Sequence, residues 1–176
     1  MVNQLSTSPL AEPPVHKKLD DMRILVVGSS GTIGSAVTKA FSERGQEVVE
    51  VTHSGGGLTV DLSDTALIKA LYDTAGKLDA VVCAAGVAQF GPLEELSDAD
   101  FAQSIENKLM GQVNLVRCGI GRVTEGGSFT LTSGGLSQNS TQPGINSFSS
   151  FRIASSSSFL RKFSTTAYPC VLYCSI

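Results

Sequence analysis

The sequence predicts an α/β fold, in which helices cover both faces of a doubly wound, parallel sheet. Short β-branched apolar runs alternate with segments of helical periodicity, and glycines stand where one gives way to the other. A chain of 176 residues can form one domain with a substantial core. We expect a flexible leader over residues 1–22, a sheet-forming domain over 23–138 and a poorly specified, serine-rich tail over 139–176.

The first unit is predicted to be strand, turn, helix and strand. Residues 23–27 (RILVV) form a continuous apolar run, as in a strand buried on both faces. Apolar residues then recur along one face of a helix that Gly45 ends: Ile33, Ala36, Val37, Ala40 and Phe41. Residues 47–51 are again apolar enough for a second strand, which completes the unit within about 30 residues.

The alternation continues along the rest of the domain. Further strands are predicted over 58–60, 80–84 and 128–132, and a helix over 64–72 that Asp64 caps. Ser97 and Asp100 resemble a capping box before a long helix. Its apolar stripe consists of Phe101, Ile105, Leu109, Val113, Val116 and Ile120. With right-handed crossovers, the expected strand order is 3-2-1-4-5.

Composition excludes several classes of function. The net charge of −3 does not favour nucleic acid or an anionic membrane surface as a partner. No apolar run approaches the roughly 20 residues that cross a bilayer, and the leader has no apolar core of a targeting signal. The four cysteines form no paired framework and no metal-ligand pattern. We therefore expect a cytoplasmic protein with reduced thiols, no metal and a small-molecule ligand.

The tail differs in character from the domain. All 16 acidic residues lie at or before Glu125, and six of the eleven aromatic residues fall in the last 29 positions without a clean period. We expect this tail not to extend the strand and helix pattern. The sheet would then be incomplete at its C-terminal side, with the fifth strand an exposed edge unless tail aromatics or a partner chain cover it.

The turn after the first strand carries three glycines with the spacing GxxGxxG. A strand end, a tight turn and a helix start aim several backbone N–H groups into one space, with the positive end of the helix dipole behind them. In such a turn, the first glycine permits the sharp exit, the second lets a phosphate approach and the third lets helix and sheet pack closely. The candidate pyrophosphate-binding residues are Gly28, Ser29, Ser30, Gly31, Thr32, Ile33 and Gly34. A structural turn without a ligand is the plainer alternative.

The end of the second strand bears on which dinucleotide binds. An NAD site usually has Asp or Glu there, whereas NADP sites lack that acid. The sequence reads Val-Thr-His-Ser at 51–54, so His53 and the amides of Gly55–Gly57 could receive a 2′-phosphate. Glu50, on the same strand face as Thr52, could instead accept a hydrogen bond from the ribose hydroxyl of NAD. His53 could also be an ordinary, exposed loop residue. We favour NADP, with NAD as the alternative.

Several ordered motifs over residues 22–135 resemble those of the short-chain dehydrogenase/reductase family, in its form with a GxxGxxG turn. Asp61 and Leu62 match the aspartate motif that contacts adenine, and Ala84, Ala85 and Gly86 match the end of the NNAG motif beside the adenosine ribose. KLMGQVNL and GSFTLTSG resemble the family's catalytic helix and fifth strand. The resemblance implies a Rossmann-like fold and hydride transfer between NAD(P)H and a carbonyl or alcohol.

The catalytic part of the resemblance is incomplete. Lys108 takes the position of the family's relay asparagine and joins the candidate cofactor-binding set, while Asn107 precedes it about 100° away round an α-helix. Ser133 is the candidate catalytic serine, although alignment places the catalytic one of the pair on Gly134. The sequence holds no Tyr-x-x-x-Lys, the family's proton-transfer pair.

These observations leave two functions open, beside the plainer possibility of a chain that folds poorly and binds nothing. The first function is an NADP-binding oxidoreductase acting on a small carbonyl or alcohol substrate. Its chemistry would be impaired because Tyr-x-x-x-Lys is absent, and the C-terminal part would be truncated or replaced. The second is a non-catalytic dinucleotide-binding sensor or interaction module. Relatives often pair through the long helix, so a homo-oligomer is a further expectation.

Overall fold

The computed structural model describes residues 21–133 and the backbone of a strand at residues 171–175. Six strands form one sheet in the order β3-β2-β1-β4-β5-β6. The strands are β1 (Arg23–Val27), β2 (Glu47–Thr52), β3 (Leu58–Thr59), β4 (Leu78–Cys83), β5 (Val123–Thr132) and β6 (Val171–Ser175). The first five are mutually parallel, which confirms the predicted order 3-2-1-4-5.

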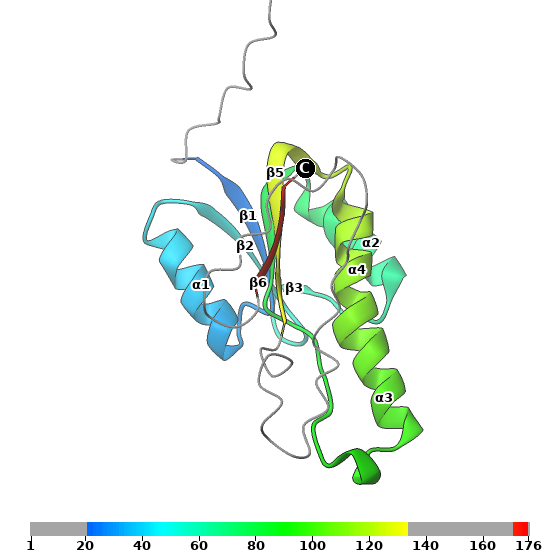
Figure 1. Cartoon of the computed structure of the whole chain (residues 1–176). Coiled ribbons are helices and arrows are strands. Elements are labelled where there is room, and N and C mark those ends of the chain that lie inside the picture. The colour runs from blue at the N-terminus through cyan, green and yellow to red at the C-terminus, as the bar shows by residue number, and fades with distance from the viewer. Residues whose placement is uncertain (1–20, 134–170, 176) are drawn as a thin grey trace, which may run out of the picture.

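Helices cover both faces of the sheet, as the fold class requires (Figure 1). Helix α1 lies on one face, and α2, α3 and α4 lie on the other. The bounds are α1 (Thr32–Ser42), α2 (Thr65–Ala75), α3 (Asp98–Ser104) and α4 (Gly111–Gly119), with a 3-10 turn at Leu93–Glu95 and a π-helical segment at Ile105–Met110. Strand order reverses between β1 and β4, and open α/β sheets bind ligands at the carboxyl ends of strands at such a switch point.

The edge of the sheet at β5 differs from the expectation. Residues 171–175 pair antiparallel with β5, from Ser128 opposite Ser175 to Thr132 opposite Val171. The expectation that no part of the tail extends the sheet is therefore wrong, and β5 is not an edge strand. The unpaired N–H and C=O groups of an uncovered β5 explain why the chain adds a strand there. The predicted leader, apart from residues 21 and 22, and the tail segment 139–170 lie outside the described residues.

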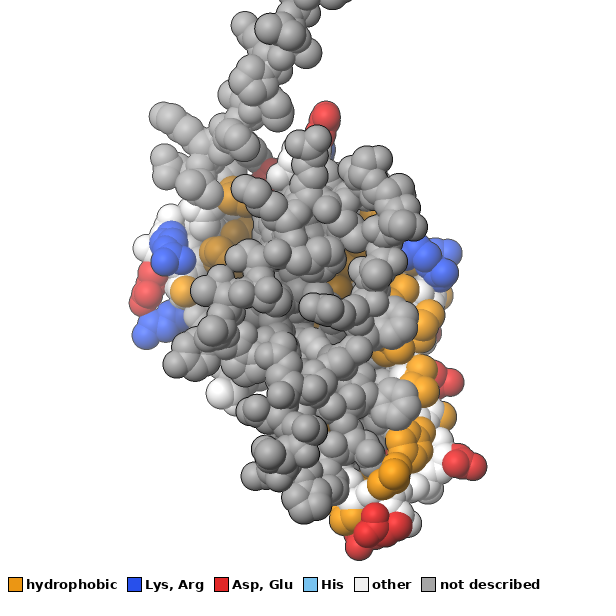
Figure 2. Space-filling view, in the orientation of Figure 1, with side chains coloured by type: hydrophobic (Ala, Val, Ile, Leu, Met, Phe, Trp, Pro, Cys, Tyr) orange, Lys and Arg blue, Asp and Glu red, His pale blue; other side chains and the backbone are white. Residues whose placement is uncertain are grey.

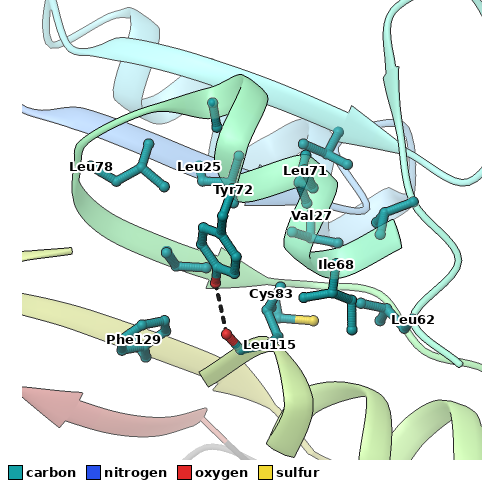
Figure 3. Packing of buried hydrophobic residues seen from close by; sticks show 14 of the residues in the cluster. Leu25, Val27, Leu62, Ile68, Leu71, Tyr72, Leu78, Cys83, Leu115 and Phe129 are labelled. Carbon is teal, nitrogen blue, oxygen red and sulfur yellow. Dashed lines mark hydrogen bonds between the residues drawn. The ribbon is translucent and has the colours of Figure 1, made fainter. Parts of the chain in front are cut away.

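The larger core lies between the sheet and helices α2 and α4 (Figure 3). Tyr72 and Phe129 are its largest fully buried side chains. The Tyr72 hydroxyl donates a hydrogen bond of 2.8 Å to the Leu115 carbonyl on α4. Burial raises the pKa of Tyr72 well above its ordinary value, so the hydroxyl stays protonated. Its hydrogen bond joins α2 to α4. A smaller core lies under α1, where Ile24, Val26, Ala80 and Val82 are buried.

The apolar stripe predicted for the long helix is not its buried face. Its six residues are half-buried or exposed, and hydrophobic side chains are visible along the α3 and α4 side of the molecule (Figure 2). The residues that are buried on this helix are Ser104, Gly111, Gln112, Asn114, Leu115 and Gly119. Small residues face inward because the helix packs closely: a Cβ on Gly119 would lie 2.4 Å from the Tyr72 hydroxyl oxygen. The π-helical segment also breaks the regular 3.6-residue period on which the prediction depended.

Candidate functional site

The glycine turn joins the carboxyl end of β1 to α1 and is fixed to the next strand. Gly28 has φ +86°, a backbone conformation that favours glycine. The backbone N–H groups of Gly28 and Ser29 both donate to the Val51 carbonyl, at 2.8 and 3.1 Å. The turn therefore follows β1, as the sequence predicts, and is hydrogen-bonded to the end of β2.

The start of α1 offers backbone donors that lack a partner within the helix. Gly31 is the N-cap residue and has no side-chain capping hydrogen bond, so the amides of Thr32, Ile33 and Gly34 are left for another acceptor. A Cβ on Gly31 would meet only the Gly28 carbonyl oxygen, at 3.4 Å, and otherwise open space. A Cβ on Gly34 would lie 1.9 Å from that same oxygen. The open space and the donors fit a phosphate group, and the close packing explains the third glycine.

The hydroxyl groups of the turn do not all face this space. The Ser29 side chain is 3% exposed and its Oγ donates to the Val51 carbonyl at 3.3 Å. Its hydroxyl holds the turn to β2, and a role for Ser29 in ligand binding stays a prediction. Ser30 and Thr32 have exposed side chains at the mouth of the turn. Ser30 and Thr32 are thus the residues of this turn whose hydroxyl groups are open to a ligand.

The ends of β2 and β3 bring His53 and Asp61 together. The hydroxyl and the backbone N–H of Ser63 both donate to Asp61 Oδ1, at 2.6 and 2.9 Å. These bonds, assisted by the nearby His53, hold the pKa of Asp61 below its ordinary value. His53 is exposed, whereas the Leu62 side chain belongs to the core at 4% exposure. Only the backbone of Leu62 could therefore serve a ligand here.

The end of β4 packs against the glycine turn. The Ala84 N–H donates to the Val27 carbonyl at 2.8 Å, and a Cβ on Gly28 would lie 3.0 Å from backbone atoms of Ala84 and Ala85. Gly86 follows with φ +114°, and a Cβ there would lie 2.6 Å from Lys108 Cδ. The small residues Ala84, Ala85 and Gly86 let this segment pass between the turn and Lys108.

Lys108 reaches across the carboxyl ends of β4 and β5. Its Nζ donates to the Ala85 carbonyl at 3.0 Å and lies 3.4 Å from Thr132 Oγ1. The Thr132 hydroxyl in turn donates to the Cys83 carbonyl at 3.0 Å. Burial lowers the pKa of Lys108, an effect that the neighbouring Cys83 partly opposes. The sequence indicated Lys108 by alignment alone, and Thr132 was not predicted.

Asn107 also reaches the segment after β4. Its Oδ1 accepts a 2.7 Å hydrogen bond from the Val87 N–H. Two consecutive helix residues thus contact residues 85–87, although the sequence predicts Asn107 to point away from the position of Lys108. Both residues lie in the π-helical segment Ile105–Met110, which was not predicted from the sequence. Gln112, one turn further on, donates from Nε2 to the Thr132 carbonyl at 2.8 Å and was likewise not predicted.

The remaining candidates are placed as follows. Ser133 is half-buried immediately after β5, beside the threonine that Lys108 contacts. Gly134, the alternative position for the catalytic serine, lies outside the described residues.

Within the described ranges, no group of three His, Cys, Asp or Glu side chains is arranged to hold a metal ion. No helix of this part of the chain is long and apolar enough to span a membrane.

A glycine turn at a switch point, with strands that end beside it, is typical of Rossmann-like, dinucleotide-binding domains. The model of the NAD dependent epimerase/dehydratase family matches residues 24–134. The chain belongs to this family, and the names of its relatives agree with the class that its motifs predict.

Curated relatives are dehydrogenases and reductases. The D-threitol dehydrogenase of Mycolicibacterium smegmatis is 28% identical over 137 residues, which cover 66% of this chain and 53% of that protein. The versicolorin reductase stcU of Emericella nidulans is 28% identical over 138 residues, which cover 66% of this chain and 52% of that protein. The chain thus spans about half the length of these relatives.

Solved structures share the fold. The protein lin1944 of Listeria innocua is 45% identical, with a TM-score of 0.62 over 64% of this chain and 56% of that one. A small-chain dehydrogenase in complex with NADPH is 26% identical, with a TM-score of 0.63 over 69% of this chain and 55% of that one. Each match covers about two thirds of this chain and supports its Rossmann-like fold.

Proposed function

We propose that this chain binds a nicotinamide dinucleotide and belongs to an oxidoreductase that acts on a small carbonyl or alcohol substrate. The observation that carries the proposal is the start of α1. There the amides of Thr32, Ile33 and Gly34 open onto space beside Gly31, at the reversal of strand order. Backbone donors at a helix N-terminus, with the helix dipole behind them, are suited to a pyrophosphate.

The preferred coenzyme is NADP. Residues 51–57, at the end of β2 and beyond it, include no carboxylate, and His53 is exposed among the glycines that follow. A carboxylate at this place would repel a 2′-phosphate, whereas an imidazole and backbone amides favour it. Glu50, also exposed, lies within β2 rather than at its end. The NADPH named in the complex of a related dehydrogenase is consistent with this preference.

The second half of the site would serve the nicotinamide and the substrate. Lys108, Thr132 and Ser133 gather where β4 and β5 end. The bound dinucleotide would supply or accept the hydride, while these side chains hold the substrate oxygen and its proton by hydrogen bonds. Ser133 is the residue that we assign to the substrate oxygen.

A non-catalytic role is the second candidate, because the sequence holds no Tyr-x-x-x-Lys. Such a module would bind the dinucleotide through the same glycine turn and change its interactions when occupied. The two functions differ in turnover. Oxidation of NADPH with a panel of aldehydes, ketones and quinones favours the enzyme, whereas tight binding without oxidation favours the module.

Titration of the purified chain with NADPH and NADH, followed by nicotinamide fluorescence, tests the proposal. We expect saturable binding at micromolar concentrations, tighter for NADPH. Gly31→Asp adds a carboxylate at the phosphate position and should abolish binding, while Lys69→Met, on the exposed side of α2, should not. If neither coenzyme changes its fluorescence with protein that is folded by circular dichroism, the proposal is wrong.

A further inference from the structure

Lys108 is the one lysine or arginine among the described residues that lies at the carboxyl ends of β4 and β5. Its Nζ contacts two neutral oxygens, the Ala85 carbonyl at 3.0 Å and Thr132 Oγ1 at 3.4 Å. The ion pairs found in residues 21–133 lie elsewhere: Arg23 with Glu47, Lys39 with Glu43, and Arg122 with Asp73. No described carboxylate therefore neutralises the Lys108 ammonium.

The surroundings of Lys108 screen its charge poorly. The side chain is half-buried, and burial lowers its pKa by penalising the charged form. The titratable group that acts on it from outside its own helix, within the described part of the chain, is the Cys83 thiol on β4. Burial raises the pKa of that thiol, so Cys83 is neutral at physiological pH and offers no countercharge. The ammonium field thus extends into the space beyond β4 and β5.

The topology indicates which ligand group would meet this field. A dinucleotide lies across the switch point, with one nucleotide on each side of the pyrophosphate. The ends of β2 and β3, with His53 and Asp61, suit the adenosine half. The nicotinamide half then falls on the side of β4 and β5, where Lys108 lies. Its ring carries a positive charge when oxidised and none when reduced.

We propose that Lys108 is a specificity-determining residue that makes this site bind the reduced nicotinamide dinucleotide in preference to the oxidised one. The inference rests on the proposed function and deepens it. Since the two coenzyme forms differ only in the ring, their phosphate and adenosine contacts cancel in the ratio of dissociation constants. The ammonium repels the oxidised ring alone, which favours carbonyl reduction and release of the oxidised coenzyme.

The test measures dissociation constants of NADP⁺ and NADPH by isothermal titration calorimetry, without any substrate. In the unaltered chain NADP⁺ should bind more weakly than NADPH. Lys108→Met should lower the NADP⁺ to NADPH ratio of dissociation constants by roughly tenfold, the order expected for one charge acting over several ångströms. Lys69→Met removes an equal charge from the exposed side of α2 and should leave the ratio unchanged. Lys108→Arg keeps the charge and should retain the preference.

A pH series provides a readout that does not depend on any variant. As pH rises through the pKa of Lys108, the side chain loses its charge, and the preference for NADPH should fall towards that of Lys108→Met. If Lys108→Met does not fold, the pH series and Lys108→Arg still test the proposal. A ratio that is unchanged by Lys108→Met and by pH, with both coenzymes bound, overturns the inference and leaves the proposed function standing. Failure of both coenzymes to bind the unaltered chain overturns the proposed function instead.

Discussion

The two halves of the sheet offer different kinds of ligand-binding groups. The half formed by β1, α1 and β2 presents backbone amides at a glycine turn, and the buried Ser29 hydroxyl holds the turn in place. The half formed by β4, β5 and the helix between them presents side chains instead, those of Lys108 and Thr132. A backbone site depends on conformation, whereas a side-chain site depends on residue identity. On the proposed function, the first half would bind a dinucleotide through its backbone, and the side chains of the second half would determine how the bound coenzyme is used.

The helix between β4 and β5 also uses its side chains to fix the loop after β4. Ser104 Oγ accepts from the Gln89 N–H at 2.9 Å, and Asn107 Oδ1 accepts from the Val87 N–H at 2.7 Å. The 3-10 turn and exposed apolar residues of this loop, Phe90 and Leu93, follow directly. The loop after β4 is thus held by individual hydrogen bonds, and single substitutions should release it.

The largest effect is expected at the third glycine of the turn. Gly34→Ala places a Cβ 1.9 Å from the Gly28 carbonyl oxygen, a backbone atom that cannot rotate away. We expect the free energy of unfolding, measured by urea denaturation and circular dichroism, to fall by about 3 kcal/mol or more. Gly31→Ala is the matched control: its Cβ meets the same oxygen at 3.4 Å and should cost under about 1 kcal/mol. Equal stability of the two variants would contradict the packing of α1 against the turn.

A smaller effect is expected in the second half. Asn107→Ala removes the acceptor of the Val87 N–H and should cost about 1 kcal/mol, since a typical hydrogen bond contributes roughly that much. Hydrogen exchange of the Val87 amide should become faster, while the amides of residues 31–34 keep their rates. Gln103→Ala breaks only an exposed contact to the Gln89 side chain and serves as the control. Unchanged exchange at Val87 would show that Asn107 does not hold this loop.

The sequence predicted the first half more completely than the second. Continuous apolar runs and glycine spacing specify β1, the turn and α1, because burial on both faces and a sharp chain reversal leave direct traces in residue type. The strand order followed from the alternation of strands and helices. Gly28 and Gly34 have the geometric roles that their spacing indicated.

The second half was harder to predict because its groups depend on helix geometry. The periodicity argument assumed 3.6 residues per turn, yet the helix contains a π-helical segment and buries small and polar residues such as Gly119 and Gln112. That face packs closely against Tyr72 through Gly119, and its buried apolar residue is Leu115, which the predicted stripe did not include. Pairing of β6 with β5 depends on an open strand edge, for which the serine-rich tail gives no periodic signal.

The central claim is that the start of α1 receives the pyrophosphate of a nicotinamide dinucleotide, and amide chemical-shift mapping tests it most directly. When ¹⁵N-labelled protein is titrated with NADPH, we expect the largest shifts at residues 31–34, with further shifts at residues 84–86. Saturable binding that shifts other amides while those of residues 31–34 stay unmoved would contradict the claim.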